Sequence, residues 1–188
     1  MRIALAGVIA ASAGSSTARA VADTLVSSDY GLLSDALGDD LPLGTGLTVA
    51  HIDAKQGESS RYLPDETHVD FLSSSDPSSQ PTTFTDLSNL SGAAVSDHAT
   101  NMGRRFYGNS DRFSMAREAN NVLLFEANDW MLDVLKHNTN SDPTVVDAVV
   151  QNFSWAGGFG SEWHTPHNSN VRTLAKFDFQ IERDDYTA

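Results

Sequence analysis

Asp53 is the first residue of this chain whose type and position could do chemistry. It ends the stretch 43–53, in which the glycines of a turn lead into a short apolar, β-branched run that predicts a buried strand. In a parallel α/β sheet, side chains at the carboxyl ends of strands point into the crevice where chemistry is done. Many strands end in an Asp that only caps the next loop, so Asp53 taken alone leaves both interpretations open.

His98 is the second such residue. The segment 97–108 predicts a short helix with this histidine in its first turn, because Ser96 or Asp97 can cap the start and Gly108 suits the end. The imidazole is therefore held on a rigid element. A lone histidine at a helix start is usually structural, so the role of His98 has to be judged from the other motifs in the chain.

A strand-end Asp53 followed by a helix-start His98 resembles the subtilisin-like serine proteases. In that family a Gly-rich turn, a strand and an Asp come first, and a helix that begins with His follows. A third stretch, 149–158, resembles the family's strand ending in Asn-x-Ser-x-Gly, whose backbone lines the substrate groove. The three matches occur in the family's order over residues 44–158. The resemblance implies an α/β, three-layer fold with a mainly parallel sheet flanked by helices.

The resemblance also implies a role for each matching residue in peptide-bond hydrolysis. Asp53 becomes the carboxylate that orients the histidine, and His98 becomes the base that takes a proton from a hydroxyl nucleophile. Ser154, Trp155 and Ala156 would present backbone groups to an extended polypeptide substrate. The expected function is that of a serine endopeptidase.

Half of that machinery has no match in the sequence. The chain contains no Gly-Thr-Ser motif for the nucleophile, and the oxyanion Asn is not found either. We therefore expect residues 44–188 to be the N-terminal part of a longer catalytic domain that does not hydrolyse peptides as it stands. Lys55 and Ala99 also depart from the glycines usual in the family. An inactive, secreted binding or scaffold domain is accordingly an open alternative.

A metal-dependent hydrolase is the second alternative. It would use His51, Asp53 and His98 with either His164 or His167 around one ion. His51 and Asp53 are two residues apart on a strand and so share a face, but the remaining ligands have no motif spacing. The loop histidines are more often exposed polar surface.

The composition excludes several classes of function. The 188 residues suffice for one domain, and a net charge of −13 argues against nucleic-acid binding, which needs clustered Lys and Arg. The absence of Cys excludes a disulfide scaffold, a thiol nucleophile and a Cys-ligated zinc site. No cofactor is indicated with certainty. Calcium remains open as a structural ion, although the acidic residues of 57–91 match no EF-hand spacing.

The first twenty residues have the anatomy of a secretory signal peptide. Residues 1–20 combine a basic start, a short apolar core and an Ala-x-Ala cleavage site, which predicts a secreted, periplasmic or cell-envelope protein. No later stretch is apolar enough to cross a membrane. A short acidic segment, 21–43, follows with helical patterns around 22–25 and 32–37, and it is too short for the folded propeptide found in many secreted subtilases.

The remaining pattern predicts alternating strands and helices. A capped helix with Asp129 at its start lies between two apolar runs of strand length, and this order implies a right-handed crossover and a parallel sheet. The long polar segment before the His98 helix predicts a surface excursion. The expected elements are a loop at 57–91, strands at 121–126 and 145–150, and helices at 129–138 and 172–186.

Overall fold

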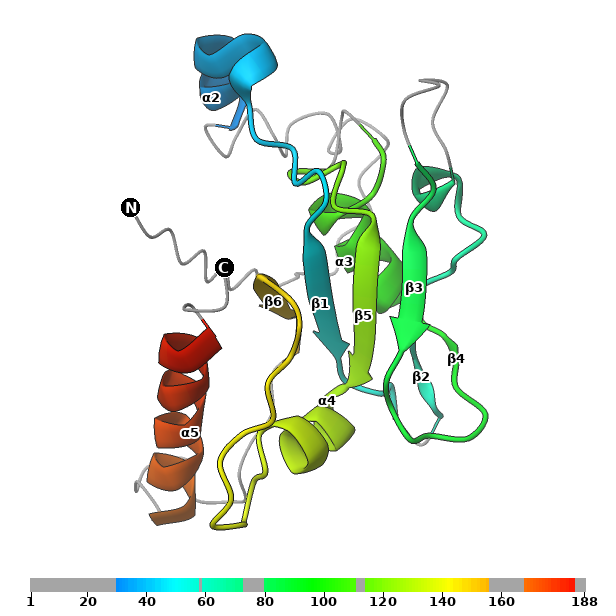
Figure 1. Cartoon of the computed structure of the whole chain (residues 1–188). Helices are drawn as coiled ribbons and strands as arrows, with labels where there is room; N and C mark the ends of the chain where they lie inside the picture. The colour runs from blue at the N-terminus through cyan, green and yellow to red at the C-terminus, as the bar shows by residue number, and fades with distance from the viewer. Residues whose placement is uncertain (1–29, 58, 73–79, 111–113, 156–167, 185–188) are drawn as a thin grey trace, which may run out of the picture.

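The computed structural model describes residues 30–57, 59–72, 80–110, 114–155 and 168–184 (Figure 1). The predicted signal peptide 1–20, the helical pattern at 22–25 and the loop histidines His164 and His167 lie outside the described residues.

A four-stranded parallel sheet forms the centre of the fold. Its strand order is β3-β5-β1-β6, so β1 lies between β5 and β6. Helices flank the sheet, and Figure 1 shows α3 behind its strands. The predicted three-layer α/β architecture is thereby confirmed. The strands are β1 (Thr48–Asp53), β3 (Thr83–Asp86), β5 (Asn121–Glu126) and β6 (Val150–Phe153).

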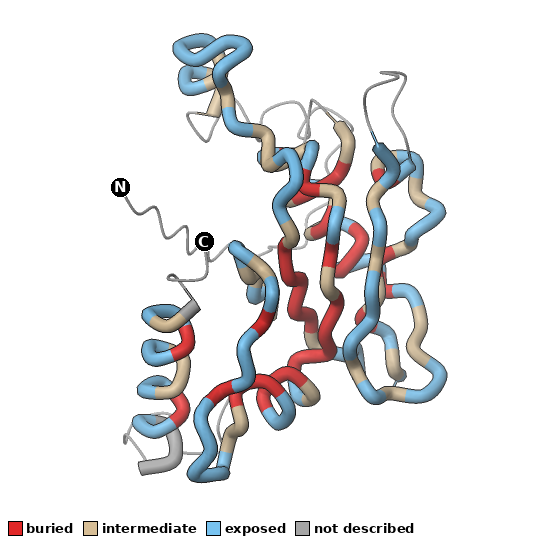
Figure 2. The backbone as a smooth tube through the Cα atoms, in the orientation of Figure 1, coloured by how far each residue is buried: buried red, intermediate tan, exposed pale blue. Residues whose placement is uncertain are grey.

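The two faces of β1 point into two different layers. Val49 belongs to a hydrophobic cluster with Tyr107, which follows α3 (Asp97–Phe106), whereas Ala50 and Ile52 belong to a second cluster. A strand covered on both faces must be apolar nearly throughout, as β1 is. Figure 2 shows the buried backbone concentrated in β1, β5 and the turn after β5. Alternation therefore places His51 and Asp53 on the α3 face.

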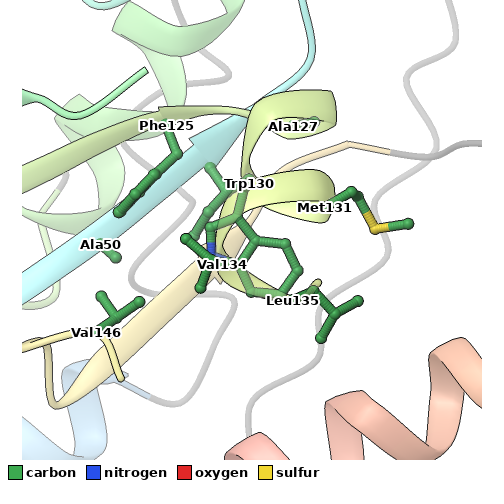
Figure 3. Packing of buried hydrophobic residues seen from close by; sticks show 9 residues of the cluster. Ala50, Phe125, Ala127, Trp130, Met131, Val134, Leu135 and Val146 are labelled. Carbon is green, nitrogen blue, oxygen red and sulfur yellow. The ribbon is translucent and has the colours of Figure 1, made fainter. Parts of the chain in front are cut away.

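The second cluster packs around Trp130 on the opposite face of the sheet. After β5, the chain forms α4 (Ala127–Asp129) and then a π-helical turn, η3 (Trp130–Val134), closed by the bond from Leu135 N to Trp130 O. Figure 3 shows the buried side chains gathered around Trp130. Phe177 of α5 (Asn168–Asp184) lies 5.1 Å from the Trp130 ring and joins α5 to this layer.

The predicted surface loop at 57–91 is wrong in part, because this segment contains regular structure. It forms β2 (Arg61–Leu63), the short helix η2 (Val69–Phe71) and β3, and β2 pairs in parallel with β4 (Ala94–Val95). Tyr62 and Phe71 are buried, so the segment contributes to the core. The polar composition of the segment gave no indication that Tyr62 and Phe71 are buried.

Other element boundaries also differ from the prediction, and the helix predicted at 172–186 begins earlier, at Asn168. The strand predicted at 145–150 is wrong, since β6 begins only at Val150, and the residue before it, Val149, donates its N–H to Thr48 O at 3.0 Å as the chain enters the sheet. A β-branched run indicates extended backbone, but the register against the neighbouring strand β1 sets the residue at which pairing begins. The helix predicted at 129–138 begins two residues earlier, and left-handed backbone at Lys136 (φ 58°) and Asn138 (φ 63°) excludes continuation.

The early helix start follows from a cap that the sequence did not reveal. Glu126, not Asp129, accepts the first backbone N–H groups of α4, at 2.9 Å from Asn128 N and 3.1 Å from Asp129 N. The Glu126 side chain is fully buried, so its carboxylate depends on these N–H groups to satisfy its oxygens. The Asp129 carboxylate instead accepts the backbone N–H of Asn89.

We expect Glu126→Ala to lower the free energy of unfolding by about 2 kcal/mol, because two partly buried N–H groups at the helix start lose their acceptor. Asp129→Ala removes a more exposed bond and should cost less than about 1 kcal/mol. Urea unfolding of both variants measures the difference. Equal losses in the two variants would contradict the assignment of Glu126 as the cap.

Candidate active site

Asp53 lies at the carboxyl end of β1 with its side chain almost fully buried. Only 4% of the side chain is exposed, and Oδ1 accepts the backbone N–H of Ala54 at 2.8 Å. Because the residues of β1 alternate between faces, the carboxylate points to the side covered by α3. It lies at the rim of the sheet where the parallel strands end.

The first turn of α3 brings His98 to this carboxylate. The side chain of Ser96 accepts the N–H of Ala99 and so caps the helix, as one of the two predicted caps. Nδ1 of His98 lies 2.9 Å from Oδ2 and 3.1 Å from Oδ1 of Asp53. Two residues that are 45 positions apart in the chain are thus in hydrogen-bond contact.

The pair is asymmetric in its exposure. The side chain of His98 is 44% exposed, compared with 4% for that of Asp53. With Nδ1 donating to the buried carboxylate, the neutral imidazole carries its lone pair on Nε2. The pair therefore presents a basic nitrogen toward solvent and keeps its anion inside the protein.

Burial governs the electrostatics of this site. It raises the pKa of Asp53 above its ordinary value, while the hydrogen bond and charge of His98 and the N–H of Ala54 act in the opposite direction. The pKa of Tyr107 is raised well above 10, first by burial and then by the charge of Asp53. Burial therefore disfavours the ionised form of Asp53, and the His98 imidazole and the Ala54 N–H favour it.

His51 and Tyr107 complete the buried side of the site. His51 Nδ1 lies 2.8 Å from the Tyr107 hydroxyl, and both residues are buried. Burial, with a smaller contribution from the charge of His98, lowers the pKa of His51 to about 4. The two-residue spacing from Asp53 was a usable signal for His51. Tyr107 offered none, because the packing of α3 on the sheet determines where its hydroxyl lies.

The predicted substrate-binding residues lie at the edge strand β6. Ser154 follows this strand, its N–H donates to Ile52 O at 3.3 Å, and its hydroxyl accepts the side-chain amide of Asn152 at 2.6 Å. Trp155 is partly buried and packs against the Trp130 cluster on the other face. Ala156 lies outside the described residues. Presentation of backbone groups to a peptide stays a prediction.

Three of the described acidic residues of 57–91 have protein partners. Asp65 accepts from Thr67, Asp70 pairs with Arg104, and Asp86 accepts the Tyr62 hydroxyl. Within the described ranges, no group of three or more His, Asp or Glu side chains is arranged to hold a metal ion. Calcium and the metal-hydrolase alternative stay predictions. The described helices include none with the length and apolarity needed to span a bilayer.

Comparison of the chain with protein-family models, with curated proteins and with solved structures gives no match in any of the three.

We expect acidification from pH 6.5 to 4 to destabilise the fold through His51. Its pKa of about 4 lies below the ordinary 6.5, so the unfolded chain binds the proton more readily in this interval. The loss of stability reaches about 3 kcal/mol at pH 4, is complete only below the pKa of the folded state, and is nearly absent above pH 7. Asp53 opposes it, because a raised pKa makes the folded state the better proton binder.

Urea unfolding of the wild type and of His51→Leu at pH 7 and pH 4.5 tests this linkage. The wild type should lose more stability than the variant between the two pH values. Parallel losses in both proteins would show that His51 is not a buried neutral histidine.

Proposed function

We propose that this chain supplies the carboxylate–histidine half of a subtilisin-like serine endopeptidase acting on polypeptides. The observation that carries the proposal is the contact of 2.9 Å between His98 Nδ1 and Asp53 Oδ2, with the carboxylate buried and the imidazole half-exposed. This is the arrangement that a general base and its orienting group require.

In the proposed reaction, Nε2 of His98 takes the proton of a hydroxyl as its oxygen attacks the peptide carbonyl. Asp53 stabilises the resulting imidazolium, and its burial keeps that attraction from being screened by water. His98 then returns the proton to the leaving amine. Asp53 stays ionised throughout and holds the ring with its proton on Nδ1.

The proposal leaves the nucleophile and the oxyanion donor to residues outside those described. Among the described residues, no hydroxyl side chain hydrogen-bonds to His98. The two hydrogen bonds of the His98 ring both go to Asp53.

An inactive binding or scaffold domain is the competing proposal, and the environment of Ala99 bears on it. The departure from glycine at this position adds a methyl group beside His98. Ala99 is fully buried, so its methyl lies in the packing beneath α3 and not in the solvent-facing space around the imidazole. The buried methyl group therefore takes up no solvent-facing surface beside the imidazole, which favours the active interpretation.

A fluorophosphonate probe, which labels serines activated by a neighbouring base, tests the proposed function in the full-length protein. His98→Ala should abolish labelling and peptide hydrolysis. Asp53→Asn should lower the rate by about four orders of magnitude, because the imidazole is then held in the wrong tautomer. EDTA should leave the labelling intact, whereas a metal-dependent hydrolase would lose its activity.

His68→Ala is the matched control, since it removes another partly buried histidine that faces Asp70 and not Asp53. Its labelling should equal that of the wild type. Unchanged labelling of His98→Ala would contradict the proposal that His98 is the general base. Absence of labelling in the wild type would leave the scaffold interpretation.

A further inference from the structure

His51 lies directly behind the Asp53–His98 pair and has no role in the reaction described above. It precedes Asp53 by two residues on the same face of β1, and only 1% of its side chain is exposed. Its Nε2 is buried without a hydrogen-bond partner and lies 4.0 Å from Oδ2 of Asp53. A buried polar atom left in this position calls for an explanation.

The contact with Tyr107 determines which nitrogen of His51 carries the proton. A neutral tyrosine needs an acceptor for its hydroxyl proton, and His51 Nδ1 lies 2.8 Å away. If the hydroxyl donates, the proton of the imidazole is on Nε2, next to the carboxylate. The other tautomer would aim a lone pair at an anion in a poorly solvated place, which is unfavourable.

Tyr107 is held firmly enough to impose this choice. Its backbone N–H donates to Gly103 O at 2.9 Å as α3 ends, and its ring packs 5.7 Å from that of Phe71. A side chain on Gly103 would place a Cβ 2.5 Å from the hydroxyl oxygen. Only glycine at this position of α3 leaves the hydroxyl room beside His51.

Both groups are neutral near pH 7. Burial lowers the pKa of His51 to about 4 and raises that of Tyr107 well above 10. His51 therefore acts on Asp53 through the dipole of an N–H bond and brings no second positive charge to compete with His98 for the carboxylate.

We propose that His51 is a positioning residue, locked by Tyr107 with its Nε2–H toward Asp53, which stabilises the ionised carboxylate and holds it toward His98. At 4.0 Å the contact is a charge–dipole attraction and not a hydrogen bond. Its contribution to peptide hydrolysis rests on the proposed function. The stabilisation of Asp53 does not, because it needs only the residues of the described fold.

The other groups that face Asp53 leave this task to His51. From α3, His98 donates to both carboxylate oxygens. From β5, Glu126 stands opposite Asp53 in register, but its carboxylate is engaged by Asn128 and Asp129. Tyr107 is within reach of the charge of Asp53, yet its hydroxyl is bonded to His51.

The Asp53 carboxyl ¹³C resonance, followed by NMR against pH in the 188-residue chain, tests the positioning role. His51→Leu should raise the pKa of Asp53 further, because the carboxylate loses a buried dipole. Tyr107→Phe, which keeps the ring and removes only the hydroxyl, should shift the pKa in the same direction. The ¹⁵N shifts of wild-type His51 should show a protonated Nε2 and an unprotonated Nδ1.

Tyr62→Phe is the matched control. It removes another buried tyrosine hydroxyl, one that is bonded to Asp86 at 2.7 Å and not to His51. It should leave the titration of Asp53 unchanged. In the full-length protein, Tyr107→Phe should lower kcat about tenfold with KM unchanged, in line with the loss of an orienting group behind the reacting residues.

The outcomes separate this inference from the proposed function. An Asp53 titration that is unchanged in both His51→Leu and Tyr107→Phe, or a proton found on Nδ1 of His51, overturns the positioning role even if His98→Ala abolishes labelling. An upward shift of the Asp53 pKa supports the positioning contact even if the wild type is never labelled, and that second result counts against the peptidase alone.

Discussion

The burial of one carboxylate at the end of a central strand is the constraint on which the rest of this site depends. Asp53 is almost removed from water, and an anion in such a place must be met by donors. His98, in the first turn of α3, and the backbone N–H of Ala54 are its hydrogen-bond partners, and His51 on the same strand lies 4.0 Å away. Each of these groups belongs to an element whose position is set by its own packing and capping. The capped helix, the buried strand and the turn after it therefore act as one assembly.

Because side chains alternate along β1, its apolar core residues and the polar residues of the site lie on opposite faces of the strand. Ala50 and Ile52 point into the Trp130 cluster, which joins the sheet to the helices on that side. His51 and Asp53 point the other way, toward α3. The polar groups of the site thus sit on a strand that is held in place by an apolar face that they do not share. This rigidity keeps the Asp53–His98 contact short without support from substrate.

Two carboxylates stand side by side where β1 and β5 end, and the structure assigns them different tasks. Glu126 accepts hydrogen bonds from the backbone N–H groups that begin α4, whereas Asp53 is paired with an imidazole that reaches solvent. Only the second arrangement can move a proton between the protein and a bound molecule. The neighbourhood of a helix start, and not the chemistry of the carboxyl group, makes the difference.

The sequence by itself determined the elements that carry Asp53 and His98, because apolar periodicity and a Ser96 cap are local signals that survive any tertiary arrangement. It also indicated the parallel α/β class through its alternation of strand and helix. The tertiary structure alone decided that the two side chains meet, that pairing of the last strand begins at Val150, and that Tyr107 reaches His51. These facts depend on strand register and on the packing of α3 against the sheet, which join residues far apart in the chain and leave no periodic trace in it.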